Sequence, residues 1–266
     1  MEKVKKVVII TGGTSGIGLE ISKIYKNNGH IVCVLAYDIE RDDDAKNLYS
    51  CDVTNEMQVK DCIEKIGKKY GKIDVVVNCA GYGLAGALEL TPTESAKRQF
   101  DTNFFGTYCV NNYAIQFMKE NSCIVNLASA CALFALPYRG LYCSSKVAVD
   151  MYSKCLRMEL SPSKIKVISI CPGDVKTNFS KNRVKVFKTN ERYGDSIQKS
   201  IAKAESNQEK RMEPNKVAKK IVKIASKKHT KPMYIIGKKV KFLYFLSKFL
   251  PQRVMIKLTN KKYGKK

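Results

Sequence analysis

The sequence predicts an α/β protein in which helices cover both faces of one doubly wound parallel sheet, so that a single domain has three layers. Short apolar runs alternate along the chain with longer stretches of helical periodicity, which is the pattern of a parallel sheet. Glycines follow the first apolar run directly and open the first helical stretch. The 266 residues, 44% of them hydrophobic, are sufficient for one large core.

The expected strands and helices follow each other in regular order. Val, Ile and Cys dominate the runs predicted as buried strands, at residues 4–10, 30–36, 73–77, 123–127, 165–170 and 233–237, with a shorter strand near Leu48. Apolar side chains at helical spacing predict helices at residues 17–28, 56–70, 103–118, 141–160 and 214–226. Ligands of such a sheet bind at the carboxyl ends of its strands.

Composition excludes several classes of protein. Ten cysteines lie without the close spacing of a metal site, and with only two histidines no metal centre is expected. Several cysteines fall among Val and Ile in predicted strands, which indicates free thiols in a reducing, cytoplasmic compartment. The charged N-terminus lacks the features of a signal peptide, and no stretch is apolar enough to span a bilayer. We therefore expect a cytoplasmic protein, with peripheral attachment to a membrane left open.

The net charge of +24 is concentrated toward the C-terminus. Glu213 is the last acidic residue, and 17 Lys and Arg follow it. Residues 238–266 combine ten of these basic residues with an apolar face that Pro251 interrupts. This pattern suits a basic amphipathic element on an anionic membrane, and it equally suits a packed C-terminal helix that covers a pocket or a subunit interface. Nucleic acid is not expected, because the aromatic residues cluster with leucines.

The glycines after the first strand form a recognisable turn, Thr11-Gly12-Gly13-Thr14-Ser15-Gly16-Ile17-Gly18. Glycines allow a tight turn and a close approach of the backbone to a pyrophosphate, and the helix that follows offers unpaired N–H groups. The strand, glycines and helix occur in the order that a Rossmann-type dinucleotide site requires. The second strand leads into residues 36–44, which contain five acidic residues and a single basic one, Arg41. Acidic groups there favour NAD(H) over NADP(H), unless Arg41 folds back to hold a 2′-phosphate.

Tyr142 and Lys146 stand four residues apart on one face of a predicted helix. A nearby cation favours the phenolate and so lowers the pKa of a tyrosine toward the range of a general acid or base. Taken alone, the pair is also what an ordinary surface helix presents.

Several motifs together resemble the short-chain dehydrogenase/reductase family over nearly the whole chain. They are the glycine turn, Asn78-Cys79-Ala80-Gly81, Asn103, Ser129, Tyr142-x-x-x-Lys146 and Pro172-Gly173, in the family's order, with only Cys79 departing from it. The resemblance implies that Tyr142 exchanges the proton of the substrate oxygen and that Ser129 orients this oxygen. It implies that Lys146 binds the nicotinamide ribose and lowers the Tyr142 pKa, and that Asn103 holds a water on a proton path.

The resemblance also assigns residues around the two ligands. Besides Tyr142 and Lys146, the residues expected at the cofactor are Gly12, Thr14, Ser15, Gly16, Ile17, Gly18, Tyr37, Asp38, Asp52, Val53, Asn78, Ala80, Gly81, Pro172, Gly173, Val175 and Thr177. Tyr82 and Leu136 are expected beside Ser129 and Tyr142 at the substrate. Each assignment has a structural alternative. Ser129 is also suited to capping a turn, Asn103 to packing inside a helix, and Asp52 to capping the helix that begins near Asn55.

The expected organisation is a catalytic domain at residues 1–237, with residues 174–213 as a substrate lid, and a basic C-terminal extension at residues 238–266. The extension resembles the ending of hydroxysteroid and retinol dehydrogenase-like members, which implies an NAD(P)-dependent oxidoreductase of a lipophilic secondary alcohol or ketone. A 3-oxoacyl-[carrier protein] reductase and a catalytically silent cofactor-sensing scaffold are the alternatives. The resemblance further implies a homo-oligomer, dimer or tetramer.

Overall fold

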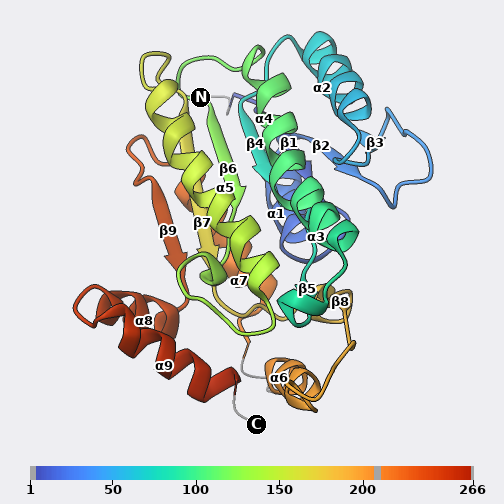
Figure 1. Cartoon of the computed structure of the whole chain (residues 1–266). Helices are drawn as coiled ribbons and strands as arrows, with labels where there is room; N and C mark the ends of the chain where they lie inside the picture. The colour runs from blue at the N-terminus through green and yellow to red at the C-terminus, as the bar shows by residue number, and fades with distance from the viewer. Residues whose placement is uncertain (1–3, 207–210, 265–266) are drawn as a thin grey trace.

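A seven-stranded parallel sheet forms the centre of the molecule in the computed structural model, which describes residues 4–206 and 211–264 (Figure 1). The strand order is β3-β2-β1-β4-β6-β7-β9. The strands are β1 (Val7–Thr11), β2 (Ile31–Ala36), β3 (Leu48–Ser50), β4 (Val75–Asn78), β6 (Cys123–Leu127), β7 (Lys166–Pro172) and β9 (Met233–Ile236). The order reverses between β1 and β4, so the predicted doubly wound sheet is confirmed.

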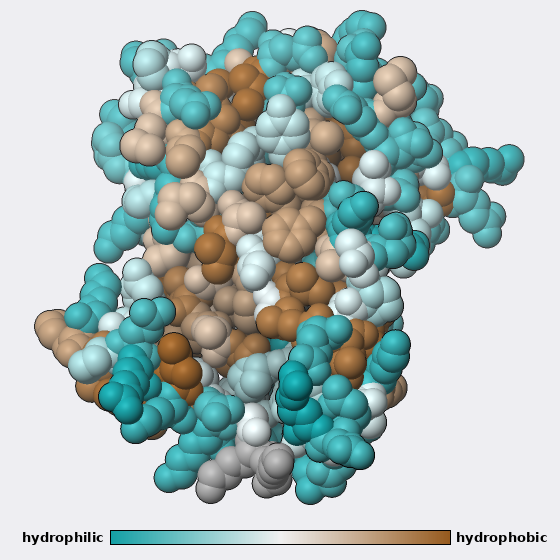
Figure 2. Space-filling view, in the orientation of Figure 1, coloured by the Kyte–Doolittle hydropathy of each residue, from teal (hydrophilic) through white to brown (hydrophobic). Residues whose placement is uncertain are grey.

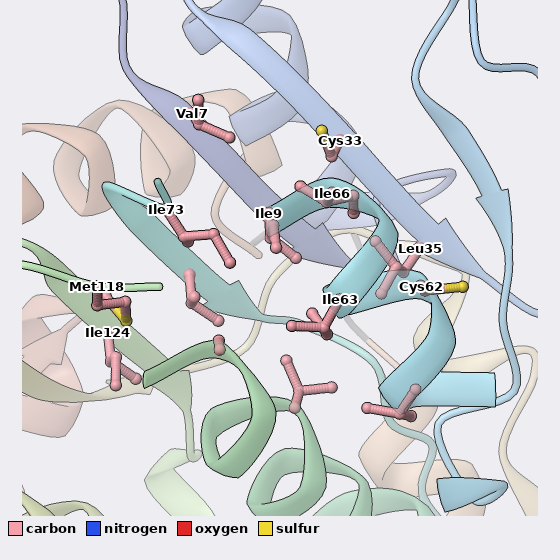
Figure 3. Packing of buried hydrophobic residues seen from close by; sticks show 14 of the residues in the cluster. Val7, Ile9, Cys33, Leu35, Cys62, Ile63, Ile66, Ile73, Met118 and Ile124 are labelled. Carbon is pink, nitrogen blue, oxygen red and sulfur yellow. The ribbon is translucent and has the colours of Figure 1, made fainter. Parts of the chain in front are cut away.

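Helices cover both faces of this sheet. On one face α1 (Gly16–Asn27) and α7 (Pro214–Ala225) pack on Val8, Ile10 and their neighbours. The other face carries α2 (Glu56–Tyr70), α4 (Gly106–Ile115) and α5 (Gly140–Glu159). Figure 3 shows Ile63 and Ile66 of α2 pointing toward Ile9 in that second core. Successive residues of β1 enter opposite cores, which is why its sequence is apolar throughout.

The helical run before β6 begins earlier than the sequence predicted. A helix was expected at residues 103–118, but α3 (Thr93–Phe100) comes first and continues through a π-helical turn, Asp101–Phe105, into α4. In α3 only Gln99 is buried, so this helix has no apolar stripe that its sequence could reveal. The π-helical turn contains Asn103, whose side chain is fully buried.

A second, two-stranded sheet lies beyond the carboxyl ends of the main strands. It pairs β5 (Leu84–Ala85) with β8 (Val184–Lys185), and α6 (Ser196–Glu205) lies below it in Figure 1. The pairing ties the segment predicted as a lid to the chain that leaves β4. Short helical turns at Leu88–Leu90, Ala130–Ala132 and Asn178–Ser180 complete this end of the molecule.

The C-terminal segment forms α8 (Lys238–Ser247) and α9 (Gln252–Tyr263), red in Figure 1, which lie beside the segment predicted as a lid and are divided by Pro251. Neither helix has a buried residue. Among the helices of residues 4–206 and 211–264, none combines the length and hydropathy of a membrane span. The ten cysteines are free thiols, and the described residues hold no cluster suited to a metal ion.

Candidate active site

The residues singled out in the sequence come together at the carboxyl edge of four neighbouring strands. The glycine turn follows β1, residues 79–81 follow β4, Ser129 follows β6, and Gly173 follows β7. Tyr142 and Lys146 enter from the first two turns of α5, which packs on β7. Parallel pairing puts all these strand ends at one edge, so segments that are far apart in sequence meet there.

The glycine turn is shaped to admit a ligand against its backbone. Gly12 and Gly16 have φ angles of 62° and 54°, which glycine adopts at no steric cost. A Cβ at Gly18 would overlap the carbonyl oxygen of Gly12, so only glycine allows α1 to start this close to the turn. The side chain of Ser15 makes no capping bond at the start of α1, which leaves that helix N-terminus available to a phosphate. The turn therefore fits the pyrophosphate of a dinucleotide.

One acidic side chain faces this turn from the end of β2. Asp38 accepts a hydrogen bond of 2.9 Å from the hydroxyl of Thr14. Three other carboxylates of the acidic loop are engaged elsewhere, because Asp42 and Asp44 pair with Lys65 and Asp43 pairs with Lys46. The preference for NAD(H) over NADP(H) that the sequence suggested therefore depends chiefly on Asp38, beside the glycine turn. Tyr37, also expected at the cofactor, is 80% exposed.

Asp52 and Asn78 have structural partners of their own. Asp52 accepts hydrogen bonds from the N–H and hydroxyl groups of Thr54, whereas Asn55 caps α2. Val53 is buried next to Gly106. The Asn78 amide donates to the side chains of Asn111 and Asn126, at 2.7 and 2.9 Å. Asn78 therefore joins β4 to β6 and α4, and its role at the adenosine stays a prediction.

Asn103 holds the chain that follows β4. Its side-chain oxygen accepts from the Tyr82 N–H at 3.0 Å, and its amide donates to the Tyr82 carbonyl and to Ser145 Oγ, both at 3.1 Å. These bonds support the packing alternative for its side chain, while its role on a proton path stays a prediction. Gly81 must be glycine here, because a Cβ would lie 2.8 Å from the Asn103 side-chain oxygen.

The phenol of Tyr142 lies beside Ser129 and against the ring of Phe179, whose centroid is 5.6 Å away. Ser129 Oγ also accepts from the Cys131 N–H at 3.1 Å, so this serine caps the turn after β6 as well. Burial raises the pKa of Tyr142, while the Ser129 hydrogen bond and the charge of Arg183 act in the opposite direction. The protein groups therefore do not lower the Tyr142 pKa as the sequence suggested, and the phenol is protonated at neutral pH.

Lys146 is a buried cation at the centre of the site, with only 6% of its surface exposed. Its ammonium donates to the carbonyl of Leu127 at 2.8 Å, and Gly81 lies next to it. Burial lowers the pKa of Lys146 from 10.5 to about 8, because a desolvated ammonium is costly. The group is thus positioned to donate to further oxygens, such as ribose hydroxyls.

The segment after β7 closes over the glycine turn. The Thr177 methyl group lies 3.3 Å from the point where a Cβ of Gly16 would stand. Gly173 donates its N–H to Ile236 and faces Val240 of α8, while Val175 pairs with Met212. Of the residues expected at the nicotinamide, Thr177 is thus the one that the structure places directly against the glycine turn.

Three side chains at the site carry no motif and were not predicted. The ring of Phe179 is tilted against that of Tyr142, Arg183 directly precedes β8, and Arg139 precedes α5. A groove of about 260 Å³ lies nearby, between residues 133–135 and the C-terminal helices. Leu133, Phe134, Leu250, Met255 and Ile256 supply its apolar lining, and Ser247, Gln252 and Thr259 add polar groups. Leu136 and Tyr82 are partly buried, and their contact with a substrate stays a prediction.

Comparisons with known proteins agree with this arrangement. The family model described as short chain dehydrogenase matches residues 6–186. A 3-ketodihydrosphingosine reductase of Bacteroides thetaiotaomicron is 33% identical over 255 residues, which cover 94% of this chain and 95% of that protein. A short-chain dehydrogenase from Streptomyces avermitilis shares the fold with a TM-score of 0.81 at 24% identity, covering 98% and 97% of the two chains. The structure of ElxO with NADP bound is 31% identical, with a TM-score of 0.70 over 88% of this chain and 96% of that one.

The buried ammonium predicts a distinctive dependence of stability on pH. Between pH 8 and 10.5 the unfolded state holds the Lys146 proton and the native state does not, so this residue makes the free energy of unfolding rise with pH. From pH 7 to pH 10, the free energy of unfolding of the wild type should rise by about 2 to 3 kcal/mol relative to Lys146→Met. Urea titrations at both pH values measure this difference. Lys68→Met, at an exposed position, is the control, and an equal change in both variants would contradict the prediction.

Proposed function

Because the chain belongs to the short-chain dehydrogenase/reductase family, we propose that it is a nicotinamide-dependent oxidoreductase that reduces a lipophilic ketone to a secondary alcohol. The observation that carries this proposal is the meeting of Ser129, Tyr142 and Lys146 at one sheet edge, beside a glycine turn shaped for a pyrophosphate. A cofactor-sensing scaffold would still use Lys146, but it would have no need of a buried phenol beside Ser129.

In the proposed reaction each residue has a separate task. The nicotinamide supplies the hydride when bound. Tyr142 donates its proton to the carbonyl oxygen, for which its raised pKa keeps the phenol in the acid form. The Ser129 hydroxyl donates to the same oxygen and orients it, so that negative charge developing there is stabilised. Lys146 holds the ribose, and its charge favours the phenolate that remains after proton transfer.

The apolar groove supports a lipophilic substrate. It begins a few residues after Ser129 and is walled by Leu133 and Phe134 on one side and by α8 and α9 on the other. Burying apolar substrate atoms there is favourable by about 25 cal/mol per Å². The relative from Bacteroides thetaiotaomicron is named for the reduction of a keto substrate, which favours the reductive direction for this chain as well.

We propose NAD(H) as the preferred cofactor. The carboxylate of Asp38 at the end of β2 is placed to accept a hydrogen bond from an adenosine ribose, and its charge would repel a 2′-phosphate. Arg41 is exposed, and no ion pair holds it over the turn in the part of the chain that the structure describes. The NADP in the ElxO structure is the observation that favours the other cofactor.

We also propose that the C-terminal helices contact an anionic membrane. Phe242, Phe245 and Phe249 are 62%, 58% and 71% exposed, and the surrounding residues carry only positive charge. Figure 2 shows brown residues between teal ones at this corner of the molecule. Exposed phenylalanines among lysines suit the boundary of an anionic bilayer, beside the groove proposed for the substrate.

The homo-oligomer expected from the sequence remains a proposal. Apolar side chains stay exposed on the π-helical turn, α4 and α5, in the middle of the face shown in Figure 2; among them are Phe105, Tyr108, Val147 and Met151. Such a patch is what a subunit interface would bury.

One prediction from the proposed reaction concerns Tyr142. Tyr142→Phe removes the donated proton, so turnover should fall by about 10²-fold or more, whereas binding of the cofactor should change little. Oxidation of NADH and NADPH is followed against long-chain aliphatic, steroid, retinoid and 3-oxoacyl ketones. Tyr152→Phe, on the same helix but away from Ser129, is the matched control. A Tyr142→Phe enzyme with the wild-type rate would refute the catalytic assignment.

A second prediction concerns cofactor choice. The wild type should bind NADH more tightly than NADPH, and Asp38→Ala should weaken NADH binding by about tenfold through the lost charged hydrogen bond. Fluorescence titration of each cofactor measures both affinities. Asp42→Ala serves as the control, because Asp42 pairs with Lys65 instead. A wild-type preference for NADPH of more than about tenfold would overturn the argument from Asp38.

A third prediction concerns the membrane. Replacing Phe242, Phe245 and Phe249 together by serine should weaken binding to phosphatidylserine-containing vesicles by about tenfold or more, since apolar area is no longer buried there. Sedimentation with vesicles measures this, and added salt should weaken binding of the wild type. Phe187→Ser, which alters another exposed phenylalanine, is the control. Equal sedimentation of the triple variant and the wild type would leave these helices with a packing role alone.

A further inference from the structure

A buried guanidinium lies beside the phenol of Tyr142 without a full set of partners. The side chain of Arg183 is 9% exposed. Its Nε lies 3.3 Å from the point where a Cβ of Gly83 would stand, and the ring of Phe179 lies 3.1 Å from the same point. Since the ring of Phe179 also contacts that of Tyr142, these contacts place Arg183 and the phenol in one cluster, and the charge of Arg183 acts on the phenol.

Glu205, the acidic neighbour of Arg183, does not satisfy the hydrogen-bonding capacity of the guanidinium. Glu205 Oε1 is 3.5 Å from Arg183 Nη1, and this nitrogen is buried and makes no hydrogen bond to any described residue. Lys185 binds both oxygens of the same carboxylate, at 2.9 and 3.0 Å. The single negative charge of Glu205 is thus shared between two cations, and one positive charge is left over.

A complete arginine–glutamate pair occurs in the same lid for comparison. Arg192 Nη1 and Glu89 Oε2 are 2.7 Å apart, and the Arg192 side chain is 71% exposed. The chain therefore forms a short pair where solvent would satisfy the arginine anyway, and leaves the buried Arg183 with the longer one. A buried charge without hydrogen bonds is costly unless a ligand supplies them.

A second cation faces the same cluster. Arg139 stands at the N-terminal end of α5, three residues before Tyr142, and its Nη2 is buried without a hydrogen bond in the described part of the chain. Its guanidinium lies over the ring of Tyr263 in α9 at 5.5 Å. The charges of Arg139 and Arg183 act on each other, and the positive end of the α5 dipole adds to them. Two cations and a helix N-terminus therefore converge beside the proposed proton donor.

We propose that Arg183, together with Arg139, binds an anionic oxygen group of the substrate, a carboxylate or a phosphate, while the reacting ketone stands at Tyr142. This inference rests on the proposed function and narrows its substrate to lipophilic ketones that carry such a group. Guanidinium groups bind these anions through paired, charge-assisted hydrogen bonds, which the unpaired Nη atoms of both arginines can supply. The apolar groove beside Phe134 takes the rest of the molecule.

The first experiment measures binding without turnover. Calorimetric titration compares octanoate, octyl phosphate, octylamine and 1-octanol, which share one chain length and differ in the head group. The two anions should bind more tightly than the alcohol and the amine, and the tighter anion identifies the head group. Arg183→Met should weaken binding of the anions by about 10- to 100-fold and leave the alcohol unchanged. Arg183→Lys keeps the charge and should retain part of the affinity, which separates charge from packing.

The second experiment uses a reactive pair of probes, 7-oxooctanoate and its methyl ester. The wild type should show a kcat/KM for the acid at least about tenfold above that for the ester, and Arg183→Met should abolish this preference mainly through the KM of the acid. Arg192→Met is the control, because it removes an arginine from the exposed pair of the same lid.

The outcomes separate the two proposals. Equal turnover of acid and ester, or an unchanged anion preference in Arg183→Met, would refute the anion site and leave the reductase standing. Octanoate binding that depends on Arg183, in an enzyme that reduces no ketone, would refute the reductase and retain the anion site.

Discussion

Parallel pairing of β1, β4, β6 and β7 is the constraint on which the site depends. Each strand ends at the same edge, and each is followed by a segment that carries one functional group: the glycine turn, Gly81, Ser129 and Thr177. The alignment is held partly by buried amides, since Asn78 of β4 bonds to Asn126 of β6. A slip of one residue between these strands would bury the wrong side chains and separate the groups that must meet.

A buried charge is the second feature of the site at this edge of the sheet. Lys146 is removed from water, and the carbonyl of Leu127 is its hydrogen-bond acceptor in the protein, so the ammonium is poised to bind further oxygens. Asn103 supports it indirectly, because it clamps the backbone of Tyr82 and thereby fixes Gly81 next to the ammonium. Groups held in this way lose little freedom when a ligand arrives, which is what preorganisation requires.

The segment predicted as a lid and the C-terminal helices supply the part of the site that is proposed to select the substrate. In the proposed function the glycine turn and the Ser129–Tyr142–Lys146 group serve a cofactor and a carbonyl, whereas Arg183, Arg139 and the groove are proposed to distinguish one carbonyl compound from another. The stacking of Arg139 on Tyr263 brings α9 next to the start of α5, so the helices proposed to touch a membrane also border the substrate groove. The proposed membrane contact and the proposed substrate groove therefore lie on one side of the molecule.

The sequence by itself determined the doubly wound sheet and the turn at Gly12, because apolar periodicity and glycine placement are local signals that one segment carries alone. It also indicated Ser129, Tyr142 and Lys146 through their family motif. The helix at Thr93–Phe100 gave no signal, since it buries only Gln99. Arg183 gave no signal either, because its burial and its incomplete pairing follow from long-range contacts. β8 pairs with β5, Gly83 leaves room for the Arg183 side chain, and Lys185 holds Glu205. Those contacts join residues roughly 20 to 100 positions apart, and only tertiary packing decides whether a charge on a polar lid faces water or the substrate.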